Sequence, residues 1–180
     1  DRERVLREME RLVRELLREN REVLDEIRKL HERTVRRNRE LAKRLEEEAK
    51  EVIDRIEKTK TPNVEELLEK VRRALERVKR HNEKTTRDDE RVLRELEKHN
   101  EETTRELKEI LDRILERVRD GKVDVKKLLE EARDVIRRAK EKSKRNLDES
   151  RRVVKETDDL SEKNREDVRK IIKEVEEELK

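Results

Sequence analysis

Residues that interrupt helices divide this chain into three nearly equal parts. The 180 residues include one proline, Pro62, and one glycine, Gly121. Proline disfavours helical geometry at the residue before it, and glycine suits the left-handed position that follows a helix end. Asn63 and Glu66 have the spacing of a capping box, and Asp124 can cap the helix that follows Gly121. Three helices are predicted, at about residues 2–58, 63–119 and 124–179.

Apolar and small side chains recur along the first predicted helix at a helical period. They make 14 steps in 51 residues, about 3.64 residues per step, whereas a left-handed supercoil needs about 3.5. The inward row is Val5, Met9, Leu12, Leu16, Asn20, Val23, Ile27, Leu30, Thr34, Asn38, Leu41, Leu45, Ala49, Val52 and Ile56. A second row widens the stripe on one side, so each helix can contact two neighbours.

With such short connections, neighbouring helices run antiparallel. The sequence therefore predicts an all-α fold, an up-down-up antiparallel three-helix bundle of long, nearly straight helices, and a single domain over residues 1–180. Both directions in which the third helix can turn around the first two satisfy the same stripes. A monomer is expected, and a domain-swapped dimer that opens at the loops remains an alternative.

The charge pattern limits the classes of partner. Charged residues make up 58% of the chain, Lys and Arg (54) nearly balance Asp and Glu (51), and no basic run suits phosphate binding. No stretch approaches a membrane span, and the first predicted turns contain no signal-peptide core. We expect a soluble protein, cytoplasmic on recombinant expression, with no nucleic-acid, membrane or small-molecule partner. Lacking cysteine, it has no disulfide.

A polar sextet occurs twice in the second predicted helix. HNEKTT occupies residues 81–86 and HNEETT residues 99–104. Their offset of 18 residues equals five whole turns, so both copies point the same way about 27 Å apart along a helix. The repeat therefore predicts two equivalent polar positions on one face.

The other two predicted helices carry the same offset. Asn20 and Asn38 are 18 residues apart, as are SKRN at 143–146 and SEKN at 161–164. In two antiparallel helices, the residue numbers of facing residues add up to a constant. Asn20 with the 99–104 sextet and Asn38 with the 81–86 sextet give the same sum, so both pairs fit one register. All three helices are thus predicted to bring similar polar groups to the same two heights.

These repeats predict two copies of one buried hydrogen-bond network. Amides, hydroxyls and imidazoles both donate and accept, so they can satisfy one another between apolar layers. An unpaired buried polar group costs about 1–3 kcal/mol, so the networks penalise any slip and specify register, which apolar layers alone leave open. One network is predicted to hold Asn20, His99, Asn100, Thr103, Ser143 and Asn146, and the other Asn38, His81, Asn82, Thr85, Ser161 and Asn164.

An extension of the second network is also predicted. The register places Thr34 beside a group of threonines and His31 within about one turn of Asp89, with which it could pair. Ser150 lies on the inward row of the third helix. The extension comprises His31, Thr34, Thr86, Asp89, Ser150 and Thr157. Two simpler interpretations stay open: His31 is exposed or fills space, and Thr86 and Thr104 flank the core and bond a backbone carbonyl of the preceding turn.

The histidines do not match the motifs of metal or catalytic sites. Bundle metal sites use Glu-x-x-His, but Arg28, Val78 and Leu96 stand three residues before the three histidines. His-x-x-x-His is absent. A single glycine excludes a phosphate-binding loop, and helical rods provide no strained nucleophile elbow. We therefore expect no catalytic residue, no cofactor, no metal and no enzymatic activity.

The whole chain resembles de novo designed helical bundles whose specificity comes from buried hydrogen-bond networks. The resemblance rests on the aromatic-free alphabet, the capped helices with minimal loops, and the repeated Asn, His, Ser and Thr layers. In that family, networks fix helix pairing, build hetero-oligomers and, in His-rich versions, sense acid. This chain departs from the acid-sensing type because it has only three histidines.

The resemblance implies a designed structural scaffold without natural biochemical activity. Its networks would specify helix pairing and register, as in the single-chain parent of a heterotrimer, and designed helix partners or self-association are compatible with it. The alternative is a pH-responsive bundle or assembly, in which protonation of buried histidines weakens the fold. A third class, a module that captures a further helix, needs a continuous exposed apolar groove, which the narrow stripes do not favour.

Overall fold

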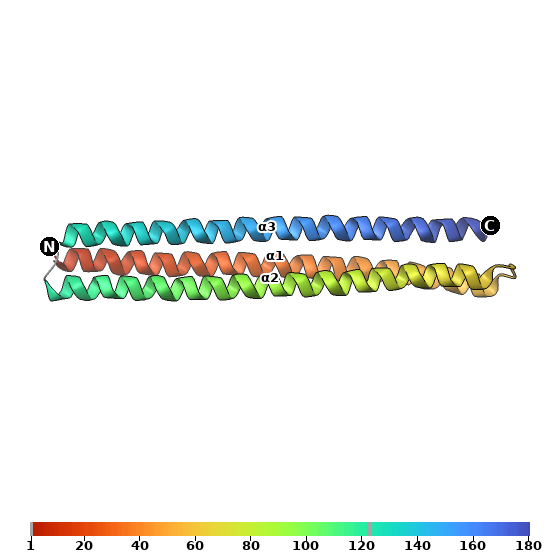
Figure 1. Ribbon diagram of the computed structural model, residues 1–180, viewed down its shortest axis with the longest axis horizontal. Coiled ribbons are helices and arrows are strands. Elements are labelled where there is room, and N and C mark those ends of the chain that lie inside the picture. The colour runs from red at the N-terminus through yellow and green to blue at the C-terminus, as the bar shows by residue number, and fades with distance from the viewer. Residues whose placement is uncertain (1, 122–123) are drawn as a thin grey trace. The chain divides into compact units, whose positions relative to one another are not determined.

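Three helices account for nearly all of the described chain. The structure, a computed structural model, describes residues 2–121 and 124–180. The helices are α1 (Arg2–Lys58), α2 (Val64–Asp120) and α3 (Val125–Glu178) (Figure 1). Each end lies within one residue of its predicted position, and no strand occurs among the described residues. The predicted all-α class is therefore confirmed.

The local signals at the helix ends explain these boundaries. Gly121 has a φ of 71°, the left-handed conformation that glycine adopts without steric cost. The Asp124 side chain accepts a hydrogen bond from the Lys126 backbone amide at 3.1 Å, as an N-cap does. At the start of α2, the Leu67 amide bonds the Asn63 carbonyl at 3.1 Å. Residues 122–123 of the predicted second connection lie outside the described residues.

Residue contacts divide the chain into two compact units, each built from all three helices. Unit 1 comprises residues 1–30 and 92–151, and unit 2 comprises residues 31–91 and 152–180. That the whole chain forms one domain remains a prediction. The two polar networks predicted above fall in different units.

Contacts within each unit establish the helix directions. In unit 1, α1 pairs with α3 through Glu8–Arg133 and Glu26–Arg151, so these two helices are parallel. α1 meets α2 through Asn20–Thr104 and Arg28–Glu97, where one number rises as the other falls, so they are antiparallel. In unit 2, His81–Ser161 and Arg77–Asp167 set α2 antiparallel to α3. This is the predicted up-down-up three-helix bundle.

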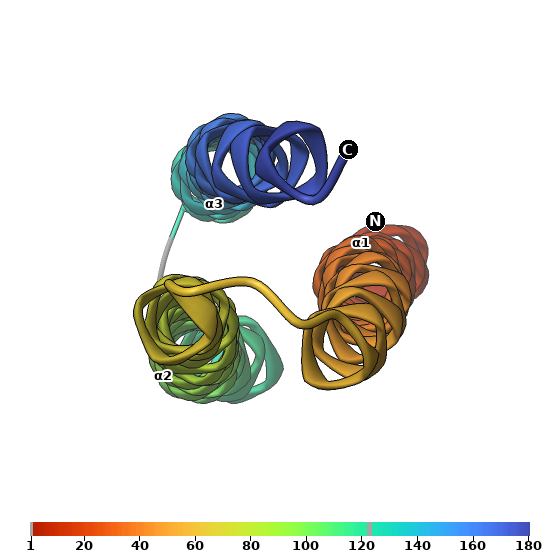
Figure 2. The ribbon, with the colours of Figure 1, turned by 90° about the vertical axis from the view of Figure 1, so that its right-hand side faces the viewer.

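The turn of the bundle is visible from its end. In unit 2, seen from the end where α1 leads into α2, the helices α1, α2 and α3 follow one another clockwise (Figure 2). The sequence leaves this choice open because both directions bury the same stripes.

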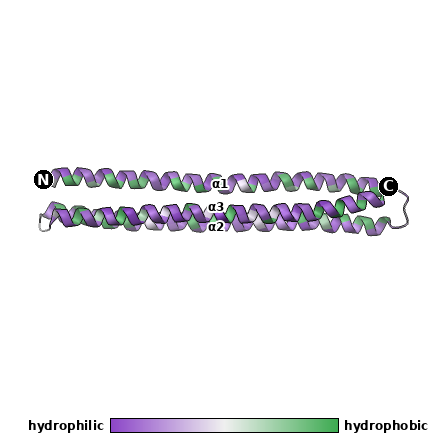
Figure 3. Cartoon of the chain, turned by 90° about the horizontal axis from the view of Figure 1, so that it is seen from above, coloured by the Kyte–Doolittle hydropathy of each residue, from purple (hydrophilic) through white to green (hydrophobic). Residues whose placement is uncertain are grey.

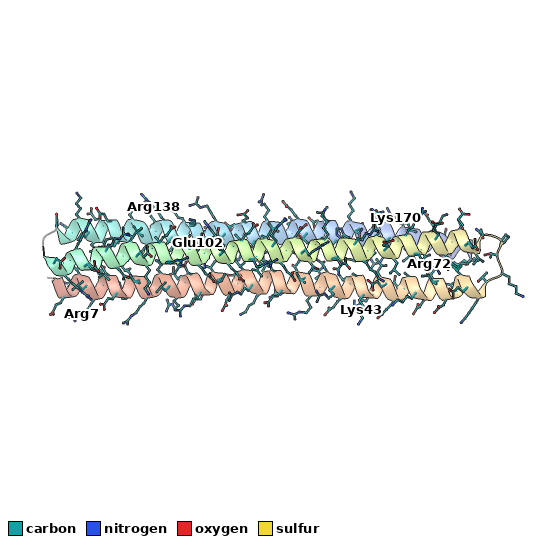
Figure 4. The ribbon with its side chains drawn as sticks, turned by 60° about the horizontal axis from the view of Figure 1, so that its bottom comes forward. Arg7, Lys43, Arg72, Glu102, Arg138 and Lys170 are labelled. Atoms are coloured by element: carbon teal, nitrogen blue, oxygen red, sulfur yellow. The ribbon has the colours of Figure 1, made fainter. Side chains whose placement is uncertain are left out.

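Each unit has its own apolar core. Hydrophobic residues recur at intervals along all three helices (Figure 3). The core of unit 1 consists of Met9, Leu16, Leu111, Ile114, Val118, Leu128, Ala132, Ile136 and Ala139. The core of unit 2 consists of Ala42, Leu45, Ala49, Val52, Ile56, Leu67, Val71, Ala74, Val78, Val168, Ile172 and Val175. Charged side chains such as Arg7 and Lys43 extend outward from α1 (Figure 4).

The predicted inward row of α1 is only partly buried: Val5, Leu12, Val23, Leu30 and Leu41 are half-buried, and next to Leu41 the buried residue is Ala42. The largest departure is at Leu30. Met9, Leu16, Ile27 and Leu45 of that row are buried, but Leu30 is half-buried, and the neighbouring His31 is the more deeply buried side chain, only 1% exposed. The inward face therefore includes a polar residue next to the leucine that the apolar pattern selects.

Candidate functional site

A buried amide joins all three helices in unit 1. Asn20 of α1 is 4% exposed. Its Oδ1 accepts a hydrogen bond from the Ser143 Oγ of α3 at 2.6 Å, and its Nδ2 donates to the Thr104 Oγ1 of α2 at 3.0 Å. Thr104 in turn donates to the Asn100 carbonyl at 2.8 Å. We call Asn20, Asn100, Thr104 and Ser143 the unit 1 network.

The unit 1 network differs from the prediction at four positions, since His99, Thr103 and Asn146 are not part of it and Thr104 is. His99 was predicted to be buried but is exposed, because the adjacent Asn100 occupies the inward face one turn after Leu96, and one residue turns a helix by about 100°. Thr104, predicted only as a flanking residue, both donates to its own helix and accepts from Asn20. Thr103 and Asn146 are half-buried.

The corresponding amide in unit 2 has different partners. Asn38 is 4% exposed, and its Nδ2 donates to the Asp158 Oδ1 at 3.3 Å while its Oδ1 accepts from the Arg165 Nη1 at 3.4 Å. Both partners come from α3, and neither was predicted. A signal was present, because Arg165 interrupts the 18-residue repeat at the position where the first copy has Leu147.

The histidine of the unit 2 sextet contacts the serine predicted for its network. His81 is half-buried, and its Nε2 lies 3.3 Å from the Oγ of Ser161, which is 3% exposed. Thr85 is buried but donates to carbonyls of its own helix, at His81 and Asn82. Asn82 and Asn164 are half-buried and line one small cavity with Asn38 and His81. Asn38, His81, Asp158, Ser161 and Arg165 are called the unit 2 network below.

A separate pair of ionisable side chains lies in unit 2. His31 Nδ1 and Asp89 Oδ1 are 3.6 Å apart, and the two side chains are 1% and 2% exposed. Within the described residues, neither ring nitrogen of His31 has a hydrogen-bond partner, nor does that Asp89 oxygen. The predicted juxtaposition is therefore present, and the interpretation of His31 as an exposed residue is wrong.

The remaining members of the predicted extension are dispersed. Thr34 is 5% exposed and Ser150 is fully buried, with no hydrogen-bond partner for the Ser150 hydroxyl among the described residues. Thr86 and Thr157 are half-buried. The His31–Asp89 pair is thus the part of the extension with a direct contact between helices.

Burial shifts the protonation equilibria of the unit 2 network. It lowers the pKa of His81, with smaller contributions from the nearby cations Arg165, Lys84 and Arg77. Burial also raises the pKa of Asp158, while the hydrogen bond from Asn38 opposes that increase. For Arg165, burial lowers the pKa. Charged groups in this network are therefore partly withdrawn from water.

The described residues contain no metal-binding group and no membrane-spanning helix. In the described part of the chain, no three His, Cys, Asp or Glu residues gather as a metal ion requires. Nor does any helix among those residues combine the length and hydrophobicity needed to cross a bilayer. The arrangement joins neighbouring helices through hydrogen bonds and contacts between charged groups.

Comparisons of this chain with models of protein families, with curated proteins and with solved structures found no match.

Proposed function

We propose that this chain is a de novo designed structural scaffold in which buried polar networks specify helix pairing and register. It needs no substrate, cofactor or natural partner for this role. The observation that carries the proposal is Asn20, a single buried amide that accepts from α3 and donates to α2. An amide joined to two other helices restricts which segments can meet around it.

The physical reason is the directionality of hydrogen bonds. Leucine and valine layers attract without strong orientation, so several offsets of one helix bury similar apolar area. Moving Asn20 away from Ser143 leaves a buried acceptor and a buried donor unpaired, at about 1–3 kcal/mol for each group. The networks therefore distinguish one register of the helices from the other offsets that the apolar core alone would tolerate.

Cutting both loops tests this proposal. Three separate peptides that correspond to α1, α2 and α3 are expected to associate as a 1:1:1 complex when they are mixed, because only that combination satisfies both networks. Native mass spectrometry of the mixture gives the stoichiometry. Homo-oligomers or scrambled mixtures in place of that complex contradict the proposal.

A matched control separates specificity from stability. In an α1 peptide with Asn20→Leu and Asn38→Leu, the core gains apolar volume but loses both amides. We expect this peptide still to assemble, since the positions are buried, but to form mixed stoichiometries with the other two. Retention of the exclusive 1:1:1 complex would show that apolar packing alone selects the partners.

A second candidate function, a pH-responsive bundle, is favoured by His81. Its lowered pKa means that the unfolded chain binds more protons than the folded one near the ordinary histidine value of 6.5. Stability is therefore fully present above that value and falls as the pH drops through it toward the lower folded pKa. Because His81 is half-buried, water screens part of the effect.

Lowering the pH from about 7 to about 5 is thus expected to reduce the free energy of unfolding through His81. His81→Gln removes that titration and should flatten this part of the profile, as measured by denaturant unfolding at each pH. His99→Gln is the matched control, because His99 is the exposed histidine of the other sextet. Identical slopes in His81→Gln and in the parent chain speak against this function.

Asp158 opposes the trend at lower pH. Its raised pKa means that the folded state binds a proton more readily than the unfolded chain, so this group favours the fold as the pH falls through the raised folded pKa toward the ordinary value of 3.8, and the gain is complete below that value. The acid response should therefore be steepest in the histidine range and weaken below it.

A further inference from the structure

The two networks leave the direction of α1 undetermined. Asn38 and Asn100 differ by 62 in residue number, and so do Asn20 and Asn82. The ends of α1 and α2 have the same offset, since Arg2 matches Val64 and Lys58 matches Asp120. If α1 were turned end for end, parallel to α2, it would keep its full overlap and bring an asparagine to each network.

The match extends to α3. In the observed arrangement Asn20 meets Ser143, whereas an inverted α1 would bring Asn38 to Ser143 and Asn20 to Ser161. Each polar height would still receive an asparagine from α1 and a serine from α3. By residue type, the repeated groups favour neither direction.

His31 and Asp89 break this symmetry. In the observed antiparallel direction their side chains meet at 3.6 Å, both almost fully buried. In the inverted direction, the same offset of 62 places His31 level with Leu93, four residues from Asp89. Four residues are about 6 Å along a helix, so the pair would separate by more than a turn.

We propose that the His31–Asp89 pair is the buried polar element that favours the antiparallel direction of α1, which the short connection to α2 also imposes, over the inverted direction. The inference rests on the proposed function, in which the networks specify pairing and register, and it adds a determinant of orientation. Inversion would separate the two groups, with the carboxyl group level with Ile27 and the imidazole level with Leu93, and each would lose its present buried neighbour.

Other unrepeated polar groups discriminate less well. Thr34 is buried and also lacks a copy 18 residues away, but a threonine hydroxyl can bond a carbonyl of its own helix in either direction. Arg28 and Glu97 form a 2.8 Å ion pair, yet their side chains are 43% and 24% exposed, so water can replace the partner. Burial and mutual dependence single out His31 and Asp89.

A circular permutant of the full chain tests the proposal. Residues 59–180 are followed by a copy of the Asp120–Asp124 connection and then by residues 1–58, so the short link forces α1 to run antiparallel to α3 and parallel to α2. Asp89→Leu with Leu93→Asp moves the carboxylate to the height that His31 takes in the permutant. The two substitutions are made in the natural order and in the permuted order.

The expected result is a change of sign. Relocating the carboxylate should lower the denaturant midpoint of the natural-order chain and raise that of the permutant, as followed by far-ultraviolet circular dichroism. A permutant that folds only when it carries Asp89→Leu with Leu93→Asp supports the proposal equally. Shifts in one direction in both orders overturn this proposal while leaving the assembly test of the three peptides unaffected. Failure of both permutants to form helix also overturns it, because orientation would then be fixed by other groups.

Discussion

Replacing Asp89 alone by leucine should lower the free energy of unfolding by about 1–3 kcal/mol, the usual cost of leaving a buried polar group without its partner. The side chain of His31 is 1% exposed and lies 3.6 Å from Asp89. Without the carboxylate, its ring would stay buried and would lose this polar neighbour. Chemical denaturation at neutral pH, followed by circular dichroism, measures the loss.

The double substitution His31→Leu and Asp89→Leu should behave differently. Replacing a whole buried pair by apolar residues of similar volume is often neutral or stabilising by about 1–4 kcal/mol. A large loss in the single variant with recovery in the double variant would identify the pair as an element of specificity rather than of net stability. If the double variant loses as much as Asp89→Leu, removing His31 restores no stability and this interpretation of the pair is wrong.

Glu97→Gln provides the matched control for this cycle. Glu97 accepts from Arg28 Nε at 2.8 Å, a shorter contact than that of the buried pair, but both side chains reach solvent. We expect a change of about 0–1 kcal/mol. The comparison separates burial from distance as the source of the effect.

Leu45→Ala is expected to cost about 2–5 kcal/mol, since it opens a cavity in the core of unit 2. Leu45 is 2% exposed and belongs to that core. In a chain of this size, each kcal/mol corresponds to a decrease of about 2–4 °C in Tm. Thermal unfolding followed by circular dichroism gives the shift.

Leu160→Ala is the same substitution at a position in unit 2 that is 59% exposed. Its expected effect is within about 0.5 kcal/mol, because a surface side chain loses little burial. Equal losses at Leu45 and Leu160 would contradict the placement of the core, whereas a large difference separates burial from helix propensity.

The 18-residue repeat predicted some contacts of the polar networks and missed others. Asn20 and Ser143 were predicted to share a network, and they are hydrogen-bonded at 2.6 Å. His81 and His99 occupy the same place in two nearly identical sextets, yet His81 is half-buried and His99 is exposed. A spacing of five turns gives the same nominal direction, but a small rotation of the local helix decides which of two adjacent residues faces inward.

The 18-residue repeat did not predict the hydrogen-bond partners of Asn38. The pattern nominated small polar groups, whereas the structure supplies Asp158 and Arg165 from α3. An arginine has a long apolar stem and can reach a buried amide while its charge stays near water. Residue type alone therefore assigns such side chains to the surface.

The features that follow from the amino-acid sequence alone are local to each helix. The single proline and the single glycine, with capping residues after them, predict the four helix ends at the two connections to within one residue, because these signals act through the backbone of adjacent residues. The apolar period likewise determined that each helix buries one face.

The clockwise order of the helices in unit 2 and the presence of Thr104 instead of His99 in the unit 1 network follow from the tertiary structure alone. Each of these depends on how three faces rotate against one another. The stripes constrain that rotation only loosely, because apolar contact tolerates it, whereas hydrogen bonds and buried charges do not.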